Sequence, residues 1–512
     1  MRSIKILLKV ALFSVGVFSA TSCHDLLDEG PENRTFAGET DYTNSSNMIL
    51  PLIGAYAEFQ ARGWEDFPLI SVRGDDVNAG GLGDQQPFWD TDHYVYAQDY
   101  WMYNSVWQNL YQDIYTCHIA MEQIEKYKEF APNPALADQY IAEARTLRAF
   151  MLFQLARVWG NVFIPESSDL AALLQQDVAT KEQVLQHISD EMTAVAPLLP
   201  AVRPNERTDI PGGVTRYTAL AIKALANLEL KNYQAVADAT SEIISSNKFS
   251  LYPDFYELFK KPGKLSDESL LELQYSDYNQ GSGTAHNYLF AFFGPENWTP
   301  AVAGAGSGWG FFEPSLKFIK FMLDRNETVR LETSVIFTNR GINELKSDPA
   351  YATLPGWISN TTRDGDQFND FNRAMFSSGK HYLPSTQLTP GRTDYGSSKN
   401  MIAIRYAEVL LMHAEALTRG ATSSAMSADQ AVNLVRQRAG LSTLSGVTSE
   451  QVMDEKFAEL AMEWGTRYYD MVRLERYNDL SYDGRTFDPS LIYLPYPQFQ
   501  VDQLPALKVQ VP

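Results

Sequence analysis

The chain has 512 residues, 45% of them hydrophobic and 21% charged, with a formal net charge of −21 at pH 7. This composition is typical of a globular protein with a large core and excludes a disordered or fibrous chain. An acidic surface repels phosphate backbones, so nucleic acid is excluded as a partner. Acidic and aromatic side chains together suit neutral sugars, because rings stack on sugar faces and carboxylates accept hydrogen bonds from hydroxyls.

The N-terminus has a basic start, an apolar stretch over residues 6–20 and small residues immediately before Cys23. This order is typical of a signal peptide that ends in a lipoprotein-processing site, and the stretch is too short for a good membrane span. We predict that residues 1–22 are removed, that Cys23 is lipidated, and that residues 23–47 form a polar tether. Ordinary secretion with an incidental cysteine is the alternative.

Helical periodicity dominates the remainder, which predicts a single, mainly α domain over residues 48–512, with minor β structure. The predicted helices lie near 48–62, 103–130, 135–159, 180–199, 214–231, 233–247, 313–324, 402–419, 427–439 and 449–478. The pairs within 214–247 and 402–439 are rich in alanine and tightly connected, which favours a tetratricopeptide-like helical-repeat scaffold over plain hairpins. Cys117 lies within a helical pattern and is predicted to be a buried, unreactive thiol.

Charged side chains interrupt the apolar stripes of these helices. They include Glu143, Arg145, Arg148, Glu408, Glu415, Arg436 and Arg473. We predict buried ion pairs that fix helix packing, because a charge on an apolar face needs a partner.

Two segments lose the helical period and are predicted to be loops inserted into the domain, at about 262–312 and 338–400. The first contains a probable strand, 269–275, followed by glycines and many aromatic residues. A second short strand is expected near 491–496. An exposed loop this aromatic should carry a binding surface or fold back onto the body.

No pattern of catalytic residues emerges. A glycoside hydrolase needs two carboxylates across a cleft, but Asp75 and Asp76 would project to opposite faces if extended. Asp364 and Asp366 flank a glycine, which is more typical of a turn or a calcium-binding loop than of catalysis. The seven histidines lack zinc-ligand spacing, and no Gly-x-Ser-x-Gly elbow occurs. We therefore expect no enzyme activity, no cofactor and no metal.

Six ordered motifs cover residues 23–28, 142–150 with 157–162, 216–246, 404–417, 435–441 with 455–473, and 493–498. Together they resemble the SusD/RagB family of outer-membrane lipoproteins of Bacteroidota. Two departures are visible: Trp464 is inserted where the family usually has Glu-Gly directly, and the tail ends at Pro512 without the usual Asn-Pro.

The resemblance implies a partner role, since the family sits as a hinged lid over a SusC-like TonB-dependent transporter. We therefore expect a protein lipid-anchored to the outer membrane and facing the cell exterior, which captures a glycan and delivers it to that barrel. Two alternatives stay open: a structural lid for a transporter of peptides or other nutrients, and a secreted glycoside hydrolase.

The ligand site is predicted where two aromatic-rich, non-periodic segments converge, residues 73–101 and 278–309, because SusD-like proteins build their ligand face from corresponding loops. The candidate ring platforms are Trp89, Trp101, Tyr278, Tyr288, Trp298 and Trp309. The candidate hydroxyl readers are Arg73, Asp75, Asn78 and Asp90. The alternative for each ring is packing beneath its own loop, which is most expected of Trp101 and Tyr288.

Overall fold

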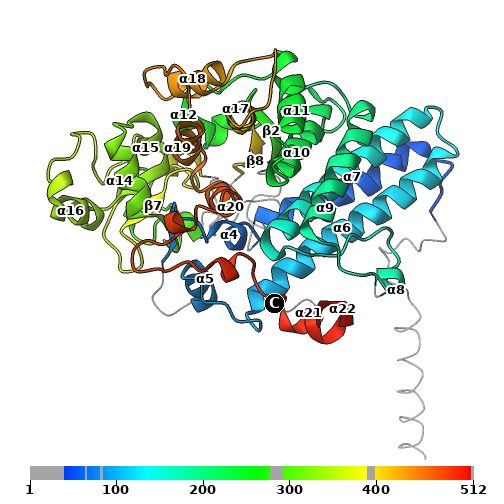
Figure 1. The fold of residues 1–512 in the computed structure, drawn as a ribbon, viewed down its shortest axis with the longest axis horizontal. Helices are drawn as coiled ribbons and strands as arrows, with labels where there is room; N and C mark the ends of the chain where they lie inside the picture. The colour runs from blue at the N-terminus through cyan, green and yellow to red at the C-terminus, as the bar shows by residue number, and fades with distance from the viewer. Residues whose placement is uncertain are drawn as a thin grey trace, which may run out of the picture.

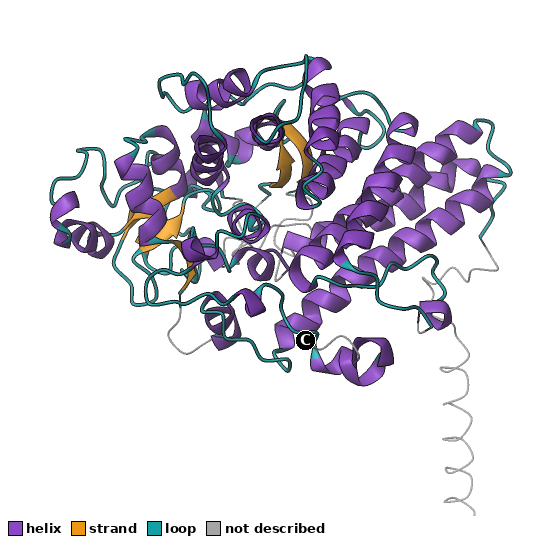
Figure 2. Ribbon diagram, viewed as in Figure 1, coloured by secondary structure: helices purple, strands orange, loops and turns teal. Residues whose placement is uncertain are grey.

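A computed structural model describes residues 40–63, 66–80, 85–173, 175–276, 292–388 and 398–508. Helices dominate this part of the chain, and the strands are short (Figures 1 and 2), which confirms the mainly α prediction. The signal peptide and Cys23 lie outside the described residues. No helix within the described ranges is long and apolar enough to cross a membrane.

The long helices of the N-terminal half lie side by side in Figure 1: α6 packs on α7, and α7 on α9. They are α3 (Leu50–Gln60), α6 (Trp101–Lys128), α7 (Pro134–Trp159) and α9 (Lys181–Val195). Local sequence sets their ends. Helix α7 begins with Pro134, whose fixed φ suits a first turn, and stops at Gly160, which has φ 76°. Thr180 and Gln183 form a capping box that starts α9.

The last residues of the predicted tether pack against α6. The ring of Tyr42 lies 4.9 Å from that of Tyr127, and its hydroxyl donates to Gln123. A 3-10 helix, Ser45–Ile49, follows and also contacts α6. Residues 41–47 are therefore part of the folded body.

Two helical hairpins form the repeat. Helices α10 (Arg216–Glu229) and α11 (Tyr233–Ser245) pack together, as do α17 (Tyr406–Thr418) and α18 (Ala428–Arg438). Helix α11 also packs on α17, so the hairpins stack as a repeat scaffold does. Ala221 and Ala237 are fully buried in these contacts, because small side chains let helices approach closely.

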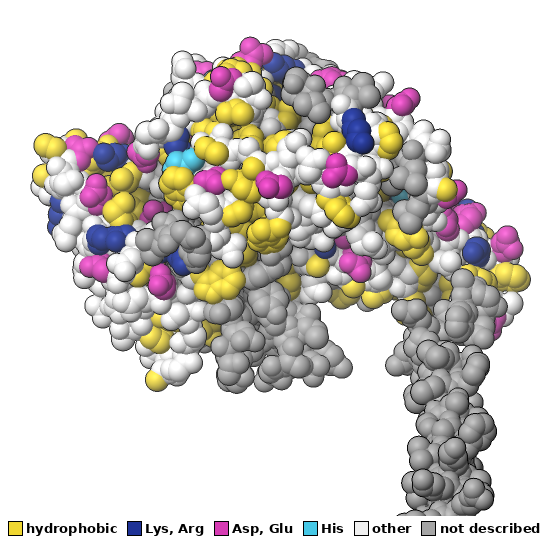
Figure 3. Space-filling model, turned by 90° about the horizontal axis from the view of Figure 1, so that it is seen from below, with side chains coloured by type: hydrophobic (Ala, Val, Ile, Leu, Met, Phe, Trp, Pro, Cys, Tyr) yellow, Lys and Arg dark blue, Asp and Glu magenta, His cyan; other side chains and the backbone are white. Residues whose placement is uncertain are grey.

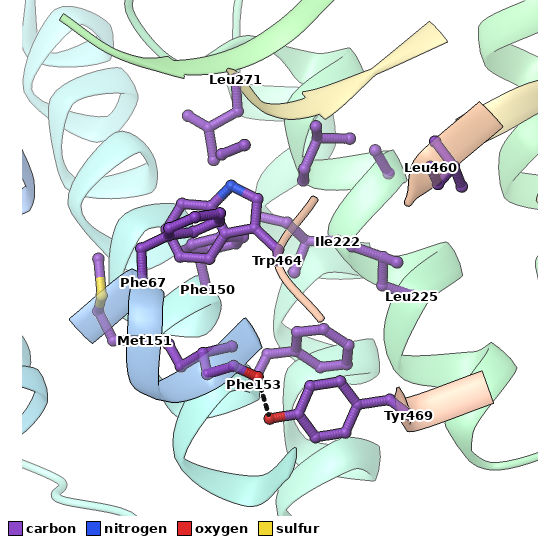
Figure 4. Close-up of a cluster of buried hydrophobic side chains, with 14 of the residues drawn as sticks. Phe67, Phe150, Met151, Phe153, Ile222, Leu225, Leu271, Leu460, Trp464 and Tyr469 are labelled. Atoms are coloured by element: carbon purple, nitrogen blue, oxygen red, sulfur yellow. Dashed lines mark hydrogen bonds between the residues drawn. The ribbon is translucent and has the colours of Figure 1, made fainter. Parts of the chain in front are cut away.

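The predicted helix 449–478 is wrong, because the chain breaks it into α19 (Ser449–Leu460) and α20 (Thr466–Arg473). Met462, Trp464 and Gly465 all have positive φ, and a left-handed residue cannot continue a right-handed helix. The break turns Trp464 into the core, where its ring lies 5.2 Å from that of Phe67 and 5.4 Å from that of Phe150 (Figure 4). The residue that departs from the family pattern is thus a core residue.

Strands of the described ranges pair into four two-stranded antiparallel sheets. They are β1 (Val77–Ala79) with β4 (Phe312–Pro314), β2 (Ser269–Leu273) with β8 (Met401–Arg405), β3 (Trp298–Thr299) with β6 (Gln367–Phe368), and β5 (Val335–Phe337) with β7 (Phe376–Ser378). The strand predicted at 269–275 is confirmed as β2. The strand predicted near 491–496 is wrong: a 3-10 turn, Pro489–Leu491, ends there, and no strand follows it up to residue 508.

The predicted loops are more structured than their sequence indicated, because β3 and β6 join one to the other. Short helices fill these and other connections. They are α4 (Asp66–Ser71), α5 (Gln86–Asp92), α8 (Leu170–Leu173), α12 (Phe255–Leu258), α14 (Leu316–Asp324), α15 (Val329–Ser334), α16 (Asn339–Ser347), α21 (Gln498–Gln503) and α22 (Pro505–Lys508).

Buried ion pairs tie the helices together, as predicted. The pairs are Glu143–Arg207 (2.9 Å), Arg145–Glu191 (3.0 Å), Arg148–Glu191, Glu415–Arg473 (2.8 Å) and Arg436–Glu455 (3.0 Å). Glu408 differs, because burial raises the pKa of its carboxyl to about 7. Cys117 is buried as predicted, and burial raises the pKa of its thiol.

Candidate functional site

The two predicted ligand segments converge on a buried aromatic cluster. Just beyond the end of the second segment, strands β1 and β4 pair Asn78 with Glu313, which brings residues 77–79 beside residues 312–314. Next to this sheet, the fully buried ring of Phe88 in α5 lies 5.9 Å from the ring of Phe292 and 5.7 Å from that of Phe311. The predicted convergence is therefore seen in the structure, and it rests on apolar packing.

Two tryptophans extend from this cluster toward the surface. Trp101, the first residue of α6, packs edge-on against Phe88 at 6.5 Å but leaves 47% of its surface exposed. Trp309 is half-buried and packs edge-on against Phe292 at 5.2 Å. The alternative for Trp101, packing as a core residue, is wrong, because nearly half of its surface stays exposed. Exposed rings anchored at one edge can stack on a flat apolar ligand face.

Trp89 and two of the predicted hydroxyl readers lie nearby and are half-buried. Trp89 stacks on His93 one turn along α5, with 3.7 Å between ring centroids. The carboxylate of Asp90 accepts hydrogen bonds from Gln86 at 2.7 Å and from the hydroxyl of Tyr100. These bonds hold the carboxylate in place while leaving acceptor capacity for a ligand hydroxyl.

The amide oxygen of Asn78 is fixed by the C-terminal part of the chain. It accepts from Arg485 at 3.0 Å and from the hydroxyl of Tyr482 at 3.3 Å. Sequence reasoning missed Tyr100, Arg485 and Tyr482. The last two carry no local signal, because they lie some 400 residues from Asn78 in the sequence. His93 had a signal, since it follows Trp89 by four residues on a helix.

Arg73 and Asp75 do not reach the surface, which corrects their prediction as hydroxyl readers. Arg73 is 0% exposed; its guanidinium lies over the ring of Tyr468 at 4.3 Å and donates to the Ile492 carbonyl at 2.9 Å. Asp75 is also 0% exposed and accepts two hydrogen bonds from Arg467, at 2.7 and 3.0 Å. Both side chains therefore hold the connection between α4 and β1 onto the C-terminal part of the chain.

Trp298 is a second correction. It keeps only 8% exposure and belongs to a separate small core, with its ring 6.0 Å from that of Phe368 and 6.3 Å from that of Tyr382. The β3–β6 pairing encloses this ring, so Trp298 serves packing. Tyr278 and Tyr288 lie outside the described residues.

The carboxylates considered for catalysis hold the fold together. Although burial opposes ionisation, Arg467 and Lys317 hold the pKa of Asp75 below its usual value. Asp76 accepts from the Met462 backbone amide at 2.6 Å, and burial raises its pKa to about 6. Asp366 is fully buried and accepts from the Ser385 amide at 2.9 Å. Each of these carboxylates accepts at least one hydrogen bond from a donor within the fold.

Asp364 likewise accepts from the Tyr256 hydroxyl. Within the described ranges, no group of three or more His, Cys, Asp or Glu side chains could hold a metal ion. We refer to the surface that carries Trp89, Asp90, Trp101 and Trp309 as the face around α5. Seen from below in Figure 3, the molecule shows hydrophobic side chains gathered in patches, with acidic and basic ones scattered between them. Such a surface offers stacking planes and hydrogen-bond acceptors.

A family profile described as "SusD family" matches residues 267–512, and one described as "Starch-binding associating with outer membrane" matches residues 27–226. The chain belongs to the SusD family. SusD-like protein P25 of Formosa agariphila is 22% identical, over 94% of this chain and 92% of that protein. A SusD-like protein of Bacteroides ovatus is also 22% identical, over 92% of this chain and 83% of that protein.

Solved structures of the family share the fold. Surface glycan-binding protein A from Bacteroides thetaiotaomicron, in complex with laminarihexaose, superposes with a TM-score of 0.73 at 23% identity, covering 90% of this chain and 98% of that chain. Surface glycan-binding protein A from Bacteroides fluxus gives a TM-score of 0.74 at 21% identity, covering 90% and 96%. The SusD fold therefore extends over nearly the whole chain.

Proposed function

We propose that this SusD-family protein is a cell-surface lipoprotein, anchored through Cys23, that captures an oligosaccharide or polysaccharide. It delivers this glycan to a SusC-like TonB-dependent transporter in the outer membrane and performs no chemistry itself. Residues 48–512, together with the packed residues 41–47, act as one SusD-like domain. The observation that carries the proposal is the pair of exposed Trp101 and half-buried Trp309, held on one buried aromatic cluster beside Asn78 and Asp90.

The chemistry of this face favours a neutral sugar. Rings stack on the C–H faces of sugars, and half-buried carboxylate and amide oxygens accept hydroxyl hydrogen bonds. The names of the structural neighbours add support, since one was solved with laminarihexaose and another is called a laminarin-binding SusD-like protein. Laminarin and laminarihexaose are thus the first probes for this protein.

The test is calorimetry and a glycan array on the mature protein, with laminarin and laminarihexaose beside a panel of other neutral polysaccharides. We expect saturable binding to at least one glycan without release of shorter sugars. Turnover by the purified protein would favour the hydrolase alternative. Binding to no sugar, with continued co-purification with the barrel, would favour the structural lid.

The anchor has its own test. Changing Cys23 to Ala removes the lipid attachment site, so the protein should move from the membrane fraction to the soluble fraction. The partner barrel must be deleted in the same strain, because it could retain the protein. Unchanged membrane fractionation in that strain would contradict the lipid anchor.

A further inference from the structure

A groove of about 540 Å³ runs between α6, the loop 163–169 and α21. Among the described residues, its lining consists mainly of five aromatic rings and five amide side chains, with one carboxylate and no lysine or arginine. The rings are Trp107, Tyr111, Tyr115, Phe163 and Phe499. Aromatic rings beside amides suit a neutral, polyhydroxylated ligand.

The groove walls are held in shape by internal contacts. The Asn104 amide donates to Gln108 at 3.0 Å and accepts from Gln500 at 2.8 Å, so it ties α6 to α21. On the other side, the Tyr111 hydroxyl donates to the Phe163 carbonyl at 3.2 Å and accepts from its amide at 2.9 Å. The groove is therefore preformed, which lowers the entropic cost of binding.

Two rings remain available inside this frame. Phe499 is 51% exposed, and Tyr115 is half-buried on the opposite element, α6. Trp107 and Phe163 are buried and form the base. An exposed ring beside amide groups offers a stacking plane next to hydrogen-bonding groups.

The groove is continuous with the face around α5 along one side of α6. Trp101, Gln108, Gln112 and Tyr115 fall within about 40° of one direction on a helix of 3.6 residues per turn. The first three are exposed, and α5 and α21 both lie at the lower edge of Figure 1. From Trp101 to Tyr115 this stripe is about 21 Å long, at ~1.5 Å per residue.

We propose that the groove is a second carbohydrate subsite, which holds the continuation of a polysaccharide whose end or middle stacks on Trp101. The occupant is a neutral glycan chain, because the lining provides stacking rings and amides but a single charge, Asp169. This inference rests on the proposed function and adds to it a preference for polymers over short oligosaccharides. A short saccharide fills the Trp101 face alone, whereas a polymer also reaches Tyr115 and Phe499.

The test compares a polysaccharide with a fragment of it too short to span about 21 Å, using laminarin and its disaccharide first and then matched pairs from the neutral panel. Calorimetry is run on the wild type, on the double variant Tyr115→Ala/Phe499→Ala, and on Gln112→Ala as a milder change. The matched control is Phe130→Ala, since Phe130 is 50% exposed beyond the far end of α6, outside the groove. Melting temperatures report on folding.

We expect the double variant to bind the polymer about tenfold more weakly while binding of the short saccharide stays unchanged. Gln112→Ala should show a smaller loss of the same kind, and Phe130→Ala none. Full polymer affinity in the double variant overturns the subsite and leaves the proposed function intact. The same holds if the double variant loses only co-purification with the transporter, because the groove is then a protein contact. If the wild type binds no saccharide at all, the proposed function fails, and this inference with it.

Discussion

Two regions of the molecule combine charged and aromatic side chains but bury them differently. One is the face around α5. The other is the helix junction around Glu459, where Glu459 of α19 meets Arg330 of α15, Arg405 of β8 and Arg438 of α18. At the junction, Glu459, Arg330 and Arg405 are at most 1% exposed. At the face, Trp101 remains 47% exposed above its aromatic base. Residue type alone therefore does not assign a role to a side chain. The role depends on whether distant parts of the chain cover that side chain.

The junction should be the most sensitive part of the molecule. The Glu459 carboxylate accepts from Arg405 at 2.6 Å and also from Arg438, and Arg330 lies at 3.4 Å. Changing Glu459 to Ala leaves buried guanidinium groups without this partner, which should lower the free energy of unfolding by about 3–5 kcal/mol. Chemical denaturation measures the loss.

The control for this change is Glu475→Ala, which removes a surface pair with Lys231 at 3.5 Å. A surface pair should contribute less than about 1 kcal/mol. Equal losses in the two variants would contradict the structural role of the junction.

The comparison of buried with exposed side chains also applies among the aromatic residues, where Trp298 is the buried example. Because Trp298 is enclosed by Phe368 and Tyr382, Trp298→Ala should leave a cavity and cost about 3 kcal/mol of stability. Its affinity for a confirmed glycan should not change. Reduced affinity with unchanged stability would return Trp298 to the ligand face.

Most helices could be predicted from the sequence because burial of one helix face leaves a local three-and-four period. The break between α19 and α20 could not, since three left-handed residues are stabilised there by docking Trp464 against Phe67 and Phe150. Packing between residues some 300 to 400 positions apart leaves no local pattern.

For the candidate site, the two segments that meet could be predicted from the sequence. The convergence of residues 73–101 with 278–309 follows from their aromatic content, and the structure shows it through Phe88 and Phe292. Which of their side chains stay exposed could not be predicted, because residues far away in the sequence cover them or pair with them. Arg73 is covered by Tyr468, and Asp75 is paired with Arg467.

Glu313, in strand β4 beneath the face around α5, makes the free energy of unfolding depend on pH. Burial raises the pKa of Glu313 to about 7, against ~4.3 when unfolded. The folded state therefore binds the proton more tightly, and this stabilisation is lost as the pH rises through 7. The free energy of unfolding should fall between pH 5 and 7.5 by roughly 1–3 kcal/mol from this group.

Glu313→Gln removes the ionisation while keeping an oxygen for the Met375 and Phe376 amides, which lie 2.6 and 2.9 Å from the carboxylate. It should reduce the pH dependence in that window, and Asp76 and Glu408, whose pKa values burial also raises, should account for part of what remains. The exposed Asp488 titrates below the window, because the Ser490 amide lowers its pKa, so Asp488→Asn should leave the slope unchanged. Identical slopes in the wild type and Glu313→Gln would show that Glu313 does not titrate there.

The smallest energetic effect belongs to the face. Removing one stacking ring, in Trp101→Ala or Trp309→Ala, should cost about 1–2 kcal/mol of binding free energy, or roughly tenfold in affinity. Stability should change little in Trp101→Ala because half of this ring already faces solvent. The Trp309 ring is more covered, so its variant should show a modest loss of both quantities.

The most direct test of the account is the affinity of Trp101→Ala for a confirmed glycan, measured by calorimetry beside its melting temperature and with Trp298→Ala as the buried comparison. For Trp101→Ala we predict about tenfold weaker binding at an unchanged melting temperature. For Trp298→Ala we predict unchanged binding at a lower melting temperature. Full affinity in Trp101→Ala would contradict the placement of the glycan on the face around α5.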